Sequence, residues 1–407
     1  MTTTSARATS ERTPTRQLLL VGLAQVLAMG TWFAASAAAP ALRQQWHLSS
    51  AEATLLTTAV QLGFVVGALT SAALNLPDVV HPPKLAAASA LVAAATTAAL
   101  PLLAHGVAAA VPLRFLTGLA LAGVYPVALK LASSWFLEGR GAALGLVVGA
   151  LTLGSTLPHL IGGSLGSAWR EGLWVAAALA ALAAVILTRT EVGPYASRST
   201  GLHPRVVLGL VRDRGPRLAN LGYVGHMWEL YAVWTWLPTF LAASFAARGV
   251  DVAAPVRALL AFLALGACGA VGCVLGGRLG DRWGRARFAA GAMGVSGACC
   301  LLAAVTFGRT PLLLVPVLLV WGTAVIADSA MFSTCTTSVV DSHYLGTALA
   351  FQTSVGFLVS AVTIQVTPLV ADARGWPFAV ASLAAGPLLG ALAMLRLTPL
   401  LPENAAA

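Results

Sequence analysis

The chain has 407 residues, 58% of them hydrophobic and only 9% charged, with a formal net charge of +10. Soluble proteins carry about 25% charged residues, so this composition excludes an ordinary soluble domain and leaves the lipid bilayer as the solvent. If the amino terminus is cytoplasmic, 17 of the 24 Lys and Arg residues fall on the cytoplasmic side of successive apolar segments. This bias follows the positive-inside rule, so the basic excess indicates topology, and we expect no nucleic acid partner.

A membrane helix needs roughly 20 predominantly apolar residues, and twelve segments of the chain meet that length. Their apolar runs are continuous, not short and alternating, which favours α-helices over a closed barrel. We therefore predict an all-α polytopic membrane protein with twelve spans and both termini in the cytoplasm. The expected spans are 17–40, 53–75, 85–104, 108–130, 141–166, 170–188, 219–244, 258–277, 288–307, 311–338, 345–370 and 376–398.

Polar segments divide these spans into two halves. A loop at 189–217 with six arginines separates an N-terminal six-helix bundle, 17–188, from a C-terminal one, 218–398. A shift of about 203 residues superposes the first two spans of each half, which is the internal repeat of a transporter whose solute binds between the halves. Residues 1–16 and 399–407 are expected to form cytoplasmic tails, the first of them disordered.

In the first half, the fourth span, RFLTGLALAGVYPVALK (114–130), carries an arginine at membrane depth. An ionisable side chain there costs at least ~2.5–3.5 kcal/mol on insertion scales, so it is a functional hypothesis by default. Arg114 is either a counter-charge for an anion or part of a proton relay, or else a packing charge that snorkels to the headgroups. We expect Tyr125 in the same span and Trp32 in the first span to line the central cavity, with close packing as the alternative.

The seventh span contains MWELYAVWTWLP (227–238), where Glu229 is the deepest acid of the chain. We expect Glu229, and Asp328 in the tenth span, to face the interior cavity, where they bind a proton or the substrate. The alternative is a structural acid neutralised by a hydrogen bond or by a nearby basic residue. His226 lies three residues before Glu229 on the same helical face, a spacing that allows a proton relay. The neighbouring aromatic residues expected to line the cavity are Trp228 and Tyr231.

The loop after the eighth span reads GGRLGDRWGRAR (276–287) and resembles the loop motif of the major facilitator superfamily, G-x-x-x-D-R-x-G-R-[KR]. The glycines of such a motif let two helices approach closely, and its acid needs arginines or a neighbouring helix N-terminus to compensate it. A charged clasp of this kind is a conformational gate for alternating access. The first-half counterpart, NLPDVVHPPK (75–84), keeps Asp78 but lacks the glycines and arginines. The matching residues of the second half are Gly277, Asp281, Arg282, Gly284, Arg285 and Arg287.

The resemblance covers essentially the whole chain. Arg114 and Gly118 match the superfamily's R-x-x-x-G pattern, and 149–163 partly matches its antiporter-associated motif. Stretches such as GVYPVALKLASSWF and WGTAVIADSAMFS resemble a bacterial branch grouped with nitrate/nitrite porters and cyanate permeases. That branch implies the bacterial cytoplasmic (inner) membrane. Nitrate porters of that group bind the anion with an arginine in the middle of the second and eighth spans. Because these spans lack an internal arginine here, the resemblance does not imply nitrate as the substrate.

Together these features predict a secondary active transporter that moves a small solute by alternating access and couples it to protons. A small anion or organic acid is favoured as substrate, and the alternative is a proton-antiport exporter of amphipathic or cationic compounds. A membrane-embedded enzyme is less consistent with the sequence, because no GxSxG, HExxH or phosphate-loop motif occurs. We expect no cofactor and no metal, and a chain that functions as a monomer.

Overall fold

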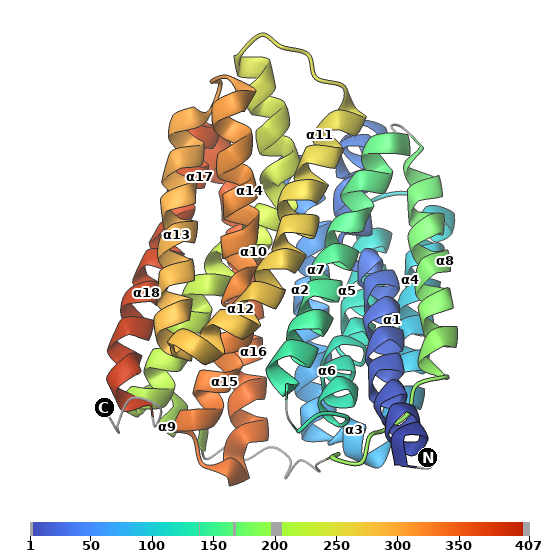
Figure 1. The fold of residues 1–407 in the computed structure, drawn as a ribbon. Helices are drawn as coiled ribbons and strands as arrows, with labels where there is room; N and C mark the ends of the chain where they lie inside the picture. Colours follow the sequence, from blue (N-terminus) through green and yellow to red (C-terminus); the bar gives the residue numbers. More distant parts are fainter. Residues whose placement is uncertain (1–2, 138, 166–167, 197–205, 402–407) are drawn as a thin grey trace.

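The computed structural model of the chain describes residues 3–137, 139–165, 168–196 and 206–401. Over these residues, 12 helices are long and apolar enough to cross a membrane. Figure 1 shows them standing side by side, with the start of α1 and the end of α18 at the same end of the bundle. The twelve observed spans correspond one to one to the twelve predicted ones, so the predicted all-α fold is confirmed.

The first half of the chain supplies six spans from seven of its eight helices, the fourth span being divided between two of them, and the short helix α3 lies between the second and third spans. The helices are α1 (Thr3–Trp46), α2 (Ser50–Ala73), α3 (Leu76–Val79), α4 (Pro82–Leu103), α5 (Val107–Leu121), α6 (Tyr125–Ser133), α7 (Arg140–Leu165) and α8 (Trp169–Leu187).

The second half repeats this order after α9 (Val207–Arg212), a short helix between the halves. Its elements are α10 (Arg214–Ala247), α11 (Ala254–Ala261), the π-helix η2 (Phe262–Cys268), α12 (Gly269–Trp283), α13 (Arg285–Thr306), α14 (Pro311–Ala327), α15 (Ser329–Val339), η3 (Ser342–Tyr344), α16 (Leu345–Arg374), α17 (Trp376–Leu383), α18 (Ala385–Leu397) and η4 (Thr398–Leu400).

Helix α1 begins at Thr3, inside the segment that was expected to be a disordered tail. The leader is polar and contains Pro14, yet the helix runs through it to join the first span. Extending an existing helix costs far less than nucleating a new one, so a stable membrane span can propagate into a polar extension. The helical order of residues 3–16 therefore depends on the span that follows.

Residues suited to helix ends set the boundaries of several spans. Ser49 and Glu52 form a reciprocal capping box at the start of α2, which satisfies two otherwise unpaired backbone N–H groups. Pro82 and Pro311 occupy the first turns of α4 and α14, where the missing N–H costs nothing. Gly284 separates α12 from α13 at φ 86°, a left-handed conformation that favours glycine.

Two seams join the halves. Helix α2 packs along α16, and α7 packs along α11, η2 and α12. Within the first half, α2 and α5 approach so closely at Gly63 and Gly118 that a Cβ atom on Gly118 would lie 2.0 Å from the Val60 carbonyl oxygen. Small residues at such crossings are how membrane helices gain packing energy without a hydrophobic driving force between them.

The fourth and tenth spans are both broken near the middle of the bundle. The fourth is interrupted between Leu121 and Tyr125, and the tenth at Asp328 between α14 and α15. The repeat of about 203 residues brings Tyr125 onto Asp328, so the two breaks occupy equivalent places in the two halves. Interrupted helices at corresponding positions are characteristic of solute and ion sites in transporters built from repeats.

The α2–α5 crossing generates a stability prediction. Gly118→Ala forces its methyl group into the backbone of α2 and should lower the free energy of unfolding by about 1–3 kcal/mol or more. Gly294→Ala is the matched control, because a Cβ on this α13 glycine meets no atom within 4 Å. That substitution should be neutral or stabilise the helix by up to about 1 kcal/mol. Thermal unfolding of the purified protein in detergent compares the two, and equal melting temperatures would contradict the packing described.

Candidate functional site

Four buried aromatic rings fill the centre of the interface between the halves. Trp32 of α1 and Phe64 of α2 lie 5.0 Å apart between ring centroids, and Tyr231 of α10 and Phe357 of α16 lie 5.1 Å apart. Across the interface, Trp32 is 5.8 Å from Tyr231, and Phe64 is 4.5 Å from Phe357. Trp32 and Tyr231 therefore lie between the halves as expected, but in this closed arrangement their rings contact one another.

A second layer of rings adjoins this central aromatic cluster. Phe33 is 6.1 Å from Tyr231 and 5.9 Å from Trp234, and it also contacts the His159 ring at 6.0 Å. Phe33 thus joins α1 to α10 of the second half and to α7 of its own half. The large side chains of the interface are thus predominantly aromatic, which suits a surface that must separate and close again without breaking ion pairs.

The two remaining residues expected to line the cavity differ in their surroundings. Tyr125, in the first turn of α6, is partly buried and packs against a core cluster that contains residues of both halves. Trp228 packs against α18 instead, where a Cβ on Gly386 would lie 2.6 Å from its indole ring. Trp228 therefore packs inside the second bundle, where Gly386 leaves room for a bulky ring.

Glu229 also points into the second bundle, contrary to the expectation that it faces the space between the halves. Its Oε1 accepts hydrogen bonds from the Ser296 hydroxyl (2.7 Å), the Cys300 thiol (3.1 Å) and the Trp321 indole N–H. These donors come from α13 and α14, so the acid joins three helices of one half. The reason is helical geometry: residues two apart differ by about 200° around a helix, which puts Glu229 opposite Tyr231.

Asp328 and His226 form a buried pair beside the break in the tenth span. The Asp328 Oδ1 atom lies 2.9 Å from His226 Nδ1, and both side chains are 2% exposed. The His226 ring contacts Phe332 at 5.1 Å and Tyr223 at 6.1 Å. The structure thus brings together two of the four ionisable residues proposed from the sequence, and pairs His226 with Asp328 instead of Glu229.

Arg114 is fully buried, and backbone carbonyl groups surround its guanidinium. Its Nη1 donates to the Thr31 carbonyl at 2.9 Å, its Nε donates to the Leu56 carbonyl at 3.3 Å, and its Nη2 donates to the Trp32 carbonyl. With 0% exposure it does not reach the headgroups, so the snorkelling alternative does not describe it. The side chain joins α5 to α1 and α2 directly beside the central aromatic cluster.

The loop motif of the second half meets the first half at the N-terminus of α7. The Asp281 carboxylate lies next to Gly141, where a Cβ would be 3.4 Å from its Oδ2, and Gly277 faces the Gly141 backbone. An acid at a helix N-terminus is favoured by the partial positive charge there. Asp281 is also 3.8 Å from Arg285, in an exposed pair. The other motif arginines, Arg282 and Arg287, are exposed.

In the first half, a lysine takes the place of the missing arginines. Lys130 Nζ lies 2.6 Å from Asp78 Oδ1 and donates to the Pro77 carbonyl at 3.1 Å. The Asp78 side chain is only 9% exposed, so this pair is more protected than the exposed pair of Asp281 and Arg285. Lys130 and Asp78 are 52 positions apart in the sequence, so only the fold brings them together.

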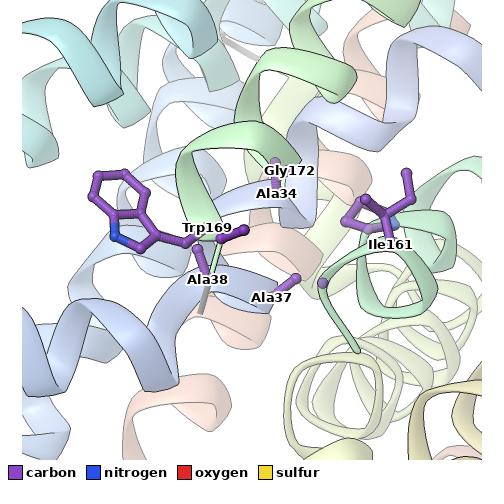
Figure 2. A pocket seen from close by; sticks show the side chains of 9 residues that line it. Ala34, Ala37, Ala38, Ile161, Trp169 and Gly172 are labelled. Atoms are coloured by element: carbon purple, nitrogen blue, oxygen red, sulfur yellow. The ribbon is translucent and has the colours of Figure 1, made fainter. Parts of the chain in front are cut away.

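A small pocket lies in the first half between α1, α7 and α8 (Figure 2). The indole N–H of Trp169 donates to the Gln45 side chain at 2.9 Å. No charged residue lines the pocket among the described part of the chain, so it offers no group for binding an ion. Its lining is Ala34, Ala37, Ala38, Pro158, Ile161, Gly162, Ala168, Trp169 and Gly172.

The family model of the Major Facilitator Superfamily matches residues 21–364, which is most of the chain. The chain belongs to this superfamily. No curated protein matches the sequence of this superfamily member. The crystal structure of a mutant of the nucleoside transporter NupG is similar to it over 94% of this chain and 99% of the other, with a TM-score of 0.70. At 14% identity this likeness concerns the fold alone.

The Asp78–Lys130 contact generates a testable coupling. A double-mutant cycle with Asp78→Asn and Lys130→Met should give a coupling energy of roughly 0.5–3 kcal/mol, because the pair is close and largely shielded from water. The exposed pair of Asp281 and Arg285, changed to Asn and Met, should couple by less than about 0.5 kcal/mol. Unfolding free energies in detergent measure both cycles. Equal coupling in the two pairs would argue against a lysine clasp in the first half.

Proposed function

We propose that this protein is a proton-coupled secondary active transporter that moves a small solute by alternating access. The observation that carries the proposal is the buried Asp328–His226 pair at the break of the tenth span. Its equivalent in the first half is Tyr125, packed against a core cluster that contains residues of both halves, which argues that both breaks adjoin the solute path. The protein acts in the cytoplasmic (inner) membrane of a bacterium, as a monomer with both termini in the cytoplasm.

Alternating access requires two halves that separate on one side while they stay together on the other. The central aromatic cluster and the contact of Asp281 with the start of α7 both join the halves in the present structure. Ring-to-ring contacts and a helix-dipole contact are each modest in free energy, so a bound solute can shift the balance between two such states. Opening would separate Trp32 and Phe64 from Tyr231 and Phe357.

Proton coupling needs a group that gains or loses charge close to the path of the solute. Asp328 and His226 can hold one shared proton or two, and a second proton turns the neutral pair into a net cation in a low-dielectric site. Glu229 is the weaker candidate, because its Oε1 is already bound by three donors inside the second bundle. We therefore assign the proton to the Asp328–His226 pair and a helix-joining role to Glu229.

The substrate hypotheses from the sequence depend on charged side chains. The hypothesis of small-anion uptake uses Arg114 as the counter-charge. Its guanidinium, however, already donates hydrogen bonds to three backbone carbonyl groups. The kinship with nitrate/nitrite porters and cyanate permeases remains a proposal from sequence resemblance. Export of amphipathic or cationic compounds would rely on Asp328 and the aromatic rings. The fold likeness to a nucleoside transporter adds uncharged solutes to the classes worth testing.

The proton assignment is tested in proteoliposomes that enclose a pH-sensitive dye. Uridine, benzoate and tetraphenylphosphonium are added outside, and solute-dependent change of the internal pH is recorded. We expect wild-type protein to move protons with at least one probe. Asp328→Asn should abolish the proton signal while it retains exchange of radiolabelled solute, because the site can no longer change charge.

Glu229→Gln is the matched control, because glutamine keeps an oxygen at Oε1 to accept the three hydrogen bonds. It should retain the proton signal. Loss of the signal in Glu229→Gln with retention in Asp328→Asn would reverse the assignment. A normal signal in both variants would contradict coupling through either acid.

A further inference from the structure

Several buried polar atoms at the interface have no hydrogen-bond partner among the described residues. Both amide atoms of Gln25 and both of Gln61 are in this state, as are the Trp32 indole nitrogen, His159 Nε2 and Ser354 Oγ. Gln25 and Gln61 are 1% and 0% exposed. Buried polar groups without partners are rare in folded proteins, and each destabilises the state in which it stays unpaired.

These groups border the central aromatic cluster. Gln25 lies seven residues before Trp32 on α1, and Gln61 lies three residues before Phe64 on α2, spacings that keep each pair on one helical face. Ser354 precedes Phe357 on α16 by the same three residues. Trp32, Phe64 and Phe357 contact one another directly, so their helical faces converge on the interface. Gln61 and Ser354 therefore lie about one helical turn from the rings at which the halves meet, and Gln25 lies about two turns from them.

The chemistry of these groups is neutral. A glutamine carboxamide offers donors on Nε2 and an acceptor on Oε1, so it matches a solute that has both kinds of group. The aromatic cluster beside it offers flat apolar surface for a ring. The basic side chains at membrane depth in the first half, Arg114 and Lys130, are bound by carbonyl groups and by Asp78. Neither is left to compensate an anion.

We propose that Gln25 and Gln61, with the rings of Trp32 and Tyr231, bind an uncharged polar solute that has hydrogen-bond donors and acceptors and one flat apolar face. This inference rests on the proposed transport function and gives it a substrate class. In the closed state the carboxamides lack partners, and a bound solute supplies them. Binding thereby removes a cost that the empty protein bears, which favours the state that holds the solute.

The test uses purified full-length protein in detergent and the solute-dependent rise of its melting temperature. The neutral probes are uridine, nicotinamide and D-glucose, and the charged probes are benzoate and tetraphenylphosphonium. We expect at least one neutral probe to stabilise the wild-type protein more than either charged probe. Gln25→Leu and Gln61→Leu should each weaken binding of that probe about tenfold or more, since the lost carboxamide leaves solute groups unpaired.

The same variants separate loss of binding from loss of folding. Without solute, Gln25→Leu and Gln61→Leu should melt at or above the wild-type temperature, because each removes unpaired polar atoms. Gln352→Leu is the matched control: Gln352 Nε2 donates to Thr336 Oγ1 at 2.7 Å, so its loss should lower the melting temperature and leave probe affinity unchanged. If the glutamine variants melt far below wild type, Gln25→Asn and Gln61→Asn report affinity instead.

Two results distinguish this inference from the transport proposal. If only charged probes stabilise the protein or are carried in proteoliposomes, the uncharged substrate class is overturned and the transport function stands. If no probe of either kind binds or crosses, both the inference and the proposed function fail. Unchanged affinity for a neutral probe in both leucine variants would overturn the assignment of the two glutamines.

Discussion

A bilayer provides no water to polar groups, so every ionisable side chain in a span must find its partner within the protein. This constraint explains the surroundings of Arg114, Lys130, Glu229 and Asp328. Arg114 binds backbone carbonyl groups of two neighbouring helices, and Lys130 pairs with Asp78. Glu229 collects three donors, and Asp328 meets His226. In each case the charged residue joins helices that are distant in sequence, so the polar groups also specify which helices pack together.

The contacts within a half differ in kind from those at the centre of the interface, although glycines such as Gly145 of α7 also bring the halves together along one seam. Inside each half, glycines bring backbones together, as at Gly118 against α2 and at Gly276, where a Cβ would lie 2.0 Å from the Ala327 carbonyl oxygen. Between the halves, the central contacts are aromatic rings such as Trp32 and Tyr231. Backbone-to-backbone packing resists any displacement because its atoms have no freedom to move aside. Ring contacts can separate at lower cost, which fits rigid halves that rock against each other.

The two halves share an architecture and differ in their chemistry. The second half keeps the glycines, the acid and the arginines of the loop motif and places Asp281 against the first half, whereas Asp78 is held by Lys130 within its own half. The ionisable residues Glu229, Asp328 and His226 all lie in the second half. The unpaired carboxamides Gln25 and Gln61 lie in the first. The second half thus carries the groups suited to protons, and the first half carries the carboxamides suited to a neutral solute.

Twelve spans, two repeated halves and the second-half loop motif follow from the sequence, because span length, charge bias and glycine spacing are local properties that survive any arrangement of the helices. Even the orientation of Glu229 could be predicted, since its two-residue separation from Tyr231 places the two side chains on opposite sides of one helix. The partners of Arg114, Lys130 and Asp328 could not be predicted from the sequence. Their contacts join residues that lie 52 to 102 positions apart, as in Lys130 with Asp78 and Asp328 with His226. Only the packing of the helices decides which acid meets which base, because the local sequence favours no one acid–base pairing over another.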